Sequence, residues 1–186
     1  MRFTSLFSTL APLVLAVSGS LFAAPVLTLT PDPLLGLAGQ TVGWSFTLTA
    51  DDTYWISAVT SFLDAETNPL LGFYTDNLGP QGGPVNFSLA PNSPAWTQSF
   101  DQSLGTGAGL YFIDGSAPTG ATNTGTLIVS FDLFSGDPTT CGSCQVGSGS
   151  ASAAFTVAVT DTPEPGTAPL VVIGLLLTAL GYRKSL

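Results

Sequence analysis

Residues 41–49 read Thr41-Val42-Gly43-Trp44-Ser45-Phe46-Thr47-Leu48-Thr49, and they carry the clearest strand pattern in the chain. From Val42 onward every second side chain is apolar, and the side chains between are small or polar. Successive side chains of a strand point to opposite faces of its sheet, so this alternation indicates a strand with one buried face. The segment therefore predicts a sheet that covers a hydrophobic core on one side.

The rest of residues 24–161 continues this pattern of short strands and turns. Residues 127–133 and 155–160 alternate in the same way, and turn-forming Pro, Gly, Asn and Asp separate the candidate strands. Outside the two ends of the chain, no segment has a convincing helical period. We therefore expect an all-β domain over residues 24–161, an antiparallel β-sandwich of jelly-roll or immunoglobulin-like architecture. The weaker candidate strands are residues 26–30, 54–63, 71–75, 85–89, 95–100 and 110–113.

Positive charge is confined to the two ends of the chain, at Arg2, Arg183 and Lys184. No histidine occurs, and all 12 acidic residues lie between Asp32 and Glu164 in a chain of formal net charge −9. The interior therefore lacks a histidine general base, a Schiff-base lysine and the histidine ligands of zinc. It also lacks the basic surface that nucleic acids bind, so we expect no nucleic-acid partner.

The N-terminus has the pattern of a secretory signal peptide over residues 1–23. Arg2 precedes an apolar helical run over residues 6–17, and small residues follow as far as Ala23, where we expect cleavage. An uncleaved anchor is the alternative, but the run is short for a bilayer span of about 20 residues. We therefore expect an exported protein.

The C-terminal segment, residues 162–186, has three parts in a fixed order. Pro163-Glu164-Pro165 comes first, an apolar stretch over residues 168–182 follows, and Arg183 and Lys184 lie near the end. As a single transmembrane helix the apolar stretch would be about 22 Å long, which is short but suits temporary retention. The positive-inside rule places Arg183 and Lys184 in the cytoplasm and the domain on the far side of the membrane.

These three parts closely resemble the PEP-CTERM sorting signal, also described as the ice-binding protein C-terminal domain. The resemblance covers about 24 residues, from Pro163 to Leu186. It implies recognition by a membrane-embedded exosortase, which cuts near Pro163-Glu164-Pro165 in Gram-negative bacteria that make exopolysaccharide. It further implies a protein that is anchored transiently in the inner membrane and then reaches the cell surface or the extracellular space. An ordinary single-pass anchor with a coincidental Pro-Glu-Pro is the alternative.

Cys141 and Cys144 are the only cysteines, and they enclose Gly142 and Ser143. In an exported chain such a close pair favours a disulfide that closes a short turn. A redox dithiol or a metal site is the alternative. A reactive dithiol needs a helix N-terminus or a nearby cation, and zinc needs two more soft ligands; the sequence shows neither.

The acidic residues raise the question of a structural calcium site, because calcium prefers carboxylate oxygens as ligands. Asp51, Asp52, Asp64 and Glu66 are the best candidates, although no regular ligand spacing connects them. The alternative is that Asp residues occupy turns for reasons of backbone geometry. We expect no other cofactor.

Aromatic side chains are the remaining candidates for function. Trp55, Tyr74 and Trp96 have mixed neighbours in their segments, so exposed rings here would stack against sugars. The leading interpretation is a non-enzymatic structural component of the extracellular matrix or biofilm, which associates with exopolysaccharide or with other copies of itself. A carbohydrate-binding module that acts through these aromatics is the alternative. A hydrolase that uses two carboxylates is a weaker one, because no spacing singles out a catalytic pair.

Overall fold

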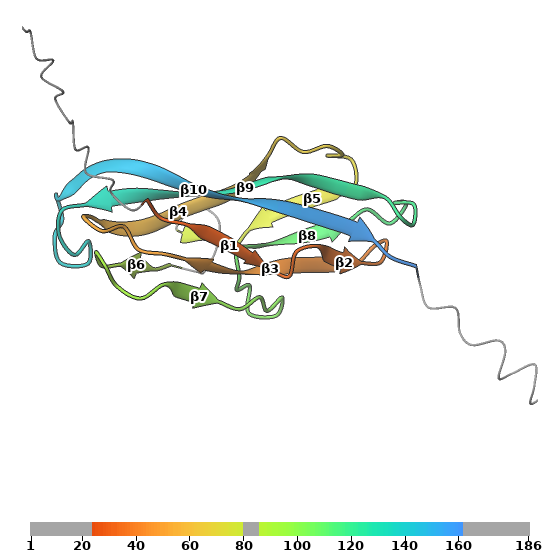
Figure 1. Cartoon of the computed structure of the whole chain (residues 1–186). Helices are drawn as coiled ribbons and strands as arrows, with labels where there is room; N and C mark the ends of the chain where they lie inside the picture. The colour runs from red at the N-terminus through yellow and green to blue at the C-terminus, as the bar shows by residue number, and fades with distance from the viewer. Residues whose placement is uncertain (1–23, 80–85, 162–186) are drawn as a thin grey trace, which may run out of the picture.

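The computed structural model of the protein describes residues 24–79 and 86–161. In this part of the chain two β-sheets face each other and enclose a hydrophobic core (Figure 1). The predictions of an all-β domain and of a sandwich are therefore confirmed. The expected signal helix and membrane helix lie outside the described residues. Among the residues that the structure does describe, no helix is long and apolar enough to cross a membrane.

Each sheet contains five strands. In the β3 sheet the order is β1-β3-β8-β5, and β7 pairs with the end of β3; in the β9 sheet the order is β2-β10-β9-β4-β6. The strands of the β3 sheet are β1 (Leu27–Thr30), β3 (Thr41–Leu48), β5 (Gly72–Asp76), β7 (Trp96–Gln98) and β8 (Gly109–Ile113). Those of the β9 sheet are β2 (Leu34–Gly36), β4 (Trp55–Asp64), β6 (Ser88–Leu89), β9 (Thr122–Phe134) and β10 (Gln145–Val159).

β3 carries the alternating pattern and supplies the centre of the core. The Trp44 ring packs against Tyr74 and Tyr111 of its own sheet and against Phe155 of the other sheet, with ring centroids 6.2, 6.3 and 5.5 Å apart. Burial of such large aromatic surfaces is a major stabilising contribution in a core of this kind. The predicted buried face of the strand is confirmed for all four of its large apolar residues, Val42, Trp44, Phe46 and Leu48.

Every strand expected from the sequence is present, with changes in length. The expected strands at 85–89 and 95–100 are reduced to two and three residues, whereas β9 and β10 extend to 13 and 15 residues. The added part of β10 is rich in Ser, Gly and Ala, which show no apolar alternation. Nearly continuous pairing with β9 holds it extended, so its neighbour and not its own sequence makes it a strand.

β2 has no counterpart among the expected strands, and among the described pairs only its pairing with β10 is parallel. β1 pairs with β3, and after Pro31-Asp32-Pro33 the chain joins the other sheet beside the end of β10. Proline has no N–H to donate to a ladder, which favours the end of β1 at Thr30. The Asp32 carboxylate accepts a hydrogen bond from the Thr156 N–H (2.8 Å), which ties the crossing to β10.

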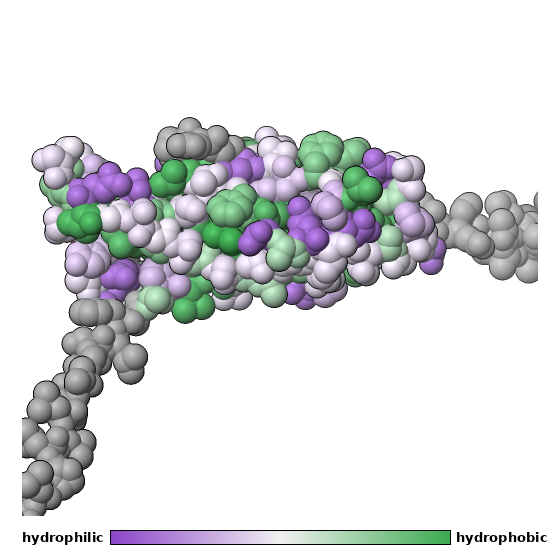
Figure 2. Space-filling model, turned by 90° about the horizontal axis from the view of Figure 1, so that it is seen from above, coloured by the Kyte–Doolittle hydropathy of each residue, from purple (hydrophilic) through white to green (hydrophobic). Residues whose placement is uncertain are grey.

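Hydrophobic side chains form small separate spots on the face drawn in Figure 2. Pale side chains of near-neutral hydropathy predominate there. Scattered exposed apolar residues are normal for a folded domain and do not by themselves mark an interface.

Candidate functional site

A shallow cleft at one end of the β9 sheet combines an aromatic side chain with polar groups. β4, β6 with the residues just before it, and the loop between β9 and β10 contribute its lining. Its volume is about 360 Å³, within the usual range of about 300–1,000 Å³ for small-molecule sites, and we call it the Trp55 cleft. Its lining residues are Trp55, Ser57, Asn86, Phe87, Ser88, Asp137 and Thr139.

Trp55 faces outward because the side chains of β4 alternate. Ile56 is fully buried, so Trp55 and Ser57 on either side of it lie on the outer face of the sheet. Ser57 lies directly opposite Asp132 of β9 and Ser88 of β6. Side chains in opposite positions stand about 5 Å apart at Cβ. Hydroxyl groups and a carboxylate therefore lie on the same face as the half-buried indole ring.

A turn at Asp137 holds the wall of the cleft. Its Oδ1 accepts hydrogen bonds from the hydroxyl of Thr139 (2.7 Å) and from its N–H (2.9 Å). These hydrogen bonds lower the pKa of the Asp137 carboxyl, and the one from the hydroxyl contributes most. The carboxylate is therefore ionised at neutral pH. The predicted disulfide is present: Cys141 and Cys144 are joined, with their Cα atoms 5.7 Å apart. It closes a short turn in the same loop, and the N–H of Cys141 donates a hydrogen bond to the Asp137 carbonyl oxygen (3.0 Å).

The groups around the Trp55 cleft suit a carbohydrate better than a purely apolar ligand. An indole ring offers a flat surface to the apolar face of a sugar ring, and neighbouring polar groups can pair with the sugar hydroxyls. Asn86 contributes an amide, Ser88 and Thr139 contribute hydroxyls, and Asp137 contributes a carboxylate. The arrangement can therefore both stack and orient a sugar.

The Tyr74 side chain is half-buried and faces the other sheet, which does not favour the expectation that its ring stacks against sugars. Its ring packs against Trp44, and its hydroxyl hydrogen-bonds with Ser61 Oγ (2.6 Å) and with the Ala108 carbonyl oxygen (2.8 Å). Burial raises the pKa of this phenol. The Ser61 hydroxyl also donates to Asp76, which completes a polar cluster between the two sheets.

Trp96 supports the Trp55 cleft but does not line it. Its ring stacks on Phe87, with centroids 3.9 Å apart and planes at 32°, and meets Phe46 edge-on at 5.5 Å. Phe87 in turn lines the cleft. Of the three aromatic candidates, only Trp55 presents its side chain to the cleft.

The four candidate calcium ligands do not come together. Two of them precede β4 and two lie at its end or just after it, so a strand about 30 Å long separates the pairs. Asp51 instead holds a turn, since its Oδ1 accepts hydrogen bonds from the N–H groups of Thr53 and Tyr54 (2.7 and 2.8 Å). Within residues 24–79 and 86–161, no group of three or more Asp, Glu, Cys or His could hold a metal ion. The structure therefore does not assemble one site from Asp51, Asp52, Asp64 and Glu66.

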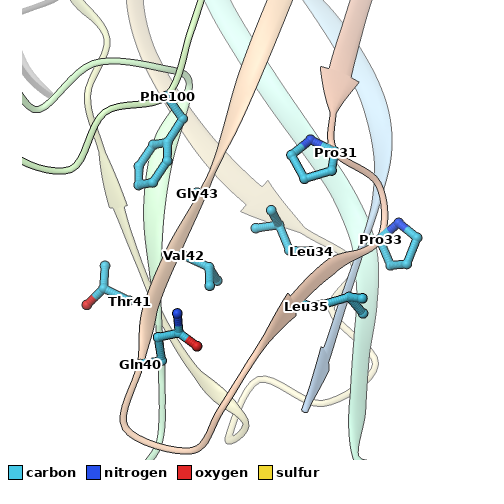
Figure 3. Close-up of a pocket in the computed structure, with 9 residues that line it drawn as sticks. All are labelled: Pro31, Pro33, Leu34, Leu35, Gln40, Thr41, Val42, Gly43 and Phe100. Carbon is cyan, nitrogen blue, oxygen red and sulfur yellow. The ribbon is translucent and has the colours of Figure 1, made fainter. Parts of the chain in front are cut away.

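A second hollow, an apolar groove of about 430 Å³, lies where the chain crosses between the sheets (Figure 3). Phe100 lies on one side of β3, and Pro31 and Pro33 lie on the other side. A Cβ at Gly43 would overlap the Phe100 ring, so glycine is required there. The lining residues are Pro31, Pro33, Leu34, Leu35, Gln40, Thr41, Val42, Gly43 and Phe100.

The apolar groove offers few groups to a polar ligand. No charged side chain lines it, and the Oε1 of Gln40 already accepts a hydrogen bond from the Leu37 N–H (2.9 Å). The Trp55 cleft is the hollow that joins an aromatic surface to several directional polar groups. We therefore take the Trp55 cleft as the candidate functional site.

Sequence reasoning identified one residue of this cleft and missed the others. Trp55 stands out as an aromatic residue in a strand, whereas Asn86 and Asp137 look like ordinary turn residues. They meet because β6 and β9 pair with opposite edges of β4. The Asp-Pro-Thr sequence at residues 137–139 marks a turn, but nothing local shows which strand that turn lies beside.

The sequence matches no protein-family model and no curated protein. The functional assignment therefore depends on the residues of the chain and on the geometry of the Trp55 cleft.

Proposed function

We propose that this protein is an exported, non-enzymatic component of the extracellular matrix that binds exopolysaccharide through its β-sandwich. The observation that carries the proposal is the Trp55 cleft, where an outward indole ring adjoins hydroxyl, amide and carboxylate groups. This combination of a stacking surface with hydrogen-bonding groups suits a sugar ring. The lack of Lys, Arg and His between Phe3 and Tyr182 favours binding over catalysis.

Delivery to the outside of the cell depends on the two ends of the chain. The signal peptide at residues 1–23 directs export, and the PEP-CTERM-like segment at residues 162–186 holds the protein in the inner membrane. An exosortase then cuts near Pro163-Glu164-Pro165, while Arg183 and Lys184 stay on the cytoplasmic side. The processed protein reaches the surface or surroundings of a Gram-negative cell.

The finer architecture of the sandwich is immunoglobulin-like and not a jelly roll. Immunoglobulin domains place strands A, B, E and D in one sheet and strands C, F and G in the other. The order β1-β3-β8-β5 in one sheet, and the adjacent β4, β9 and β10 in the other, support this assignment. One difference is that β6, which pairs with β4, follows β5 in the sequence. Loops cluster at the two ends of such sandwiches, and a loop forms one wall of the Trp55 cleft.

Affinity electrophoresis tests the binding. The processed protein is run in gels with and without the exopolysaccharide of the producing cells, and we expect it to be retarded by the polysaccharide. Trp55→Ala removes the stacking surface and should weaken binding at least about threefold. Tyr54→Ala is the matched control, because it removes a neighbouring aromatic (37% exposed) that does not line the cleft. Equal retardation of Trp55→Ala and the unaltered protein would contradict the proposal.

A separate experiment tests delivery. Cells with and without their exosortase are fractionated, and the C-terminus of the protein is identified by mass spectrometry. We expect a shortened protein outside the inner membrane only when exosortase is present. If the protein stays in the inner membrane with an intact tail in both strains, the sorting proposal is wrong, whatever the result for binding.

A further inference from the structure

The Trp55 cleft belongs to a domain that has negative side chains but no positive ones. All 12 acidic residues lie between Asp32 and Glu164, and no Lys, Arg or His occurs between Phe3 and Tyr182. Exposed charges act over about 8 Å at physiological ionic strength. A polysaccharide that carries uronate or sulfate groups would therefore meet only like charge on the side chains of this surface.

One carboxylate lines the cleft, and a second lies beside one of its lining residues. Asp137 lines the cleft, and its Oδ1 accepts hydrogen bonds from the N–H and hydroxyl of Thr139. The Oδ2 of Asp137 accepts no hydrogen bond from the described residues. Asp132 lies directly opposite the lining residue Ser57, on the same outer face of the β9 sheet. In the described part of the chain, no group donates a hydrogen bond to the Asp132 carboxylate. Both residues therefore have oxygens available to a ligand beside Trp55.

The geometry points to a cationic amino-sugar polymer as the ligand of the Trp55 cleft. This inference rests on the proposed polysaccharide binding and names the chemical class of the glycan. The sugar ring stacks on the indole, and a protonated amine on that ring or the next pairs with Asp132 or Asp137. A cation close to the indole face is also attracted to the ring. An N-acetylated sugar keeps the stacking but loses the charge.

A basic peptide carries the same positive charge, but the lining of the cleft favours a sugar. Ser57, Ser88 and Thr139, which carry hydroxyl groups, and Asn86, which carries an amide, line the cleft together with Trp55. A sugar ring has several hydroxyls that can pair with such groups, whereas an extended Lys or Arg side chain has polar atoms only at its tip. The cleft therefore has more hydrogen-bonding groups than a single cationic side chain uses.

The test compares oligomers of equal length that differ in charge. The processed protein is titrated with hexamers of glucosamine, N-acetylglucosamine and galacturonic acid, and with hexalysine, while tryptophan fluorescence is followed. We expect the glucosamine hexamer to bind about tenfold more tightly than its N-acetylated form, which lies within the range that two exposed ion pairs contribute. Added salt should reduce this preference, and the galacturonate hexamer should bind most weakly.

Matched variants locate the effect. Asp132→Asn combined with Asp137→Asn removes both charges and keeps an oxygen that can accept the hydrogen bonds of Thr139. This double variant should bind the glucosamine and N-acetylglucosamine hexamers equally well. Asp114→Asn is the control, because Asp114 forms the same kind of turn with Ser116 (2.7 Å to its N–H) in the loop after β8. It removes a carboxylate outside the cleft and should keep the tenfold preference.

Each other outcome overturns the inference in a different way. If all three glycans bind equally and their binding depends on Trp55, the inference that the ligand is cationic is wrong, while the proposed polysaccharide binding still holds. If hexalysine binds as tightly as the glucosamine hexamer, the cleft is a site for cations and not for amino sugars. If no glycan hexamer binds, this inference fails, and affinity electrophoresis with the native exopolysaccharide decides the proposed function separately.

Discussion

Asn123 joins three segments of the chain inside the sandwich. Its side chain is fully buried, and its Nδ2 donates to Glu66 Oε2 (2.6 Å) and to the Tyr111 hydroxyl (3.1 Å). Its Oδ1 accepts a hydrogen bond from the Asn68 N–H (2.9 Å). A buried amide is tolerated when it has partners such as these. Asn123 therefore stabilises the place where β9, β8 and the loop after β4 meet.

Replacing Asn123 by alanine should lower the free energy of unfolding by about 3 kcal/mol. The substitution leaves Glu66 and the Asn68 N–H without their partner. Tyr111→Phe is the control, since it removes one hydroxyl from the same cluster and should cost about 1 kcal/mol. Urea denaturation of the processed protein measures both variants, and equal losses would contradict the central role of Asn123.

Three aspartates and two tyrosines have shifted pKa values, and they make the stability of the fold depend on pH at acid and at alkaline pH. Asp101, Asp114 and Asp137 each accept hydrogen bonds from the side chain and N–H of a Ser or Thr two positions later. These bonds hold the pKa of each carboxyl below its ordinary value of 3.8. Burial raises the pKa of Tyr74 and of Tyr111 above the ordinary value of 10.0.

The melting temperature should therefore be nearly constant between about pH 5 and pH 9 and fall on either side. Below about pH 4 the unfolded chain binds protons at these aspartates more readily than the folded chain, so acid favours unfolding. Above about pH 10 the tyrosines ionise in the unfolded chain while they stay neutral in the folded one, so alkali favours unfolding. No His occurs, and no Lys lies before residue 184. Calorimetry across this range tests the profile, and a step near about pH 6 to 7 would disagree with it.

Among the elements, β2 shows how a short strand can complete a sheet. It has only three residues, yet it covers the end of β10 and lets the first part of the chain contribute to both sheets. Leu34 is 3% exposed and faces the core, whereas Leu35 is 58% exposed. Substitutions at these two adjacent leucines can therefore test which face of β2 points into the core.

Alanine substitutions at these two positions should differ strongly in their effect. Leu34→Ala should lower the free energy of unfolding by about 3 kcal/mol because it leaves a cavity in the core. Leu35→Ala removes a mostly exposed side chain and should change it by less than about 0.5 kcal/mol. Urea denaturation compares the two variants. Similar losses would show that β2 does not present alternate residues to the core in this register.

β4 shows how one element brings separate parts of the chain to the candidate site. It pairs with β9 over most of its length and with β6 near its start. Its first residues supply Trp55 and Ser57, and its two neighbours bring the loops that carry Asn86 and Asp137. The Trp55 cleft is therefore a product of strand pairing, and the proposed function depends on this arrangement.

At the scale of the whole molecule, the uneven distribution of charge is the most unusual property. In a domain without Lys or Arg, the polar surface consists of Ser, Thr, Asn and acidic side chains, and its charge repels polyanions. Both ends that carry the positive residues are removed by the proposed processing. The mature protein would then have no basic side chain at all.

Trypsin should therefore leave the processed protein uncut, even after denaturation, because no Lys or Arg occurs between Phe3 and Tyr182. A protease specific for glutamate serves as the control and should cut the denatured chain after Glu66. The intact mass, measured before and after each digestion, shows whether either protease has cut the chain. A tryptic loss of the last two residues, Ser185 and Leu186, would show that the anchor segment is still attached.

The sequence predicted most of the strands but missed β2 and the first half of β10, which depend on pairing with a neighbouring strand. β3 was identifiable because its apolar residues alternate within a few positions, while the Ser- and Gly-rich half of β10 shows no such contrast. For the candidate site, Trp55 could be named, but Tyr74, which the sequence offered as an exposed ring, packs against Trp44. Its neighbour Phe73 is 60% exposed, so the more hydrophobic ring of the pair faces water and local composition misleads.

The amino-acid sequence alone was sufficient for the all-β class, the buried face of β3 and the Cys141–Cys144 disulfide, because these features depend on residues a few positions apart. The partner of each strand, the crossing at β2 and the Trp55 cleft required the folded chain. They depend on which distant segments complete one another's hydrogen bonds and bury one another's apolar faces. A local pattern shows that a strand needs a partner, but only packing of the whole domain selects which partner it finds.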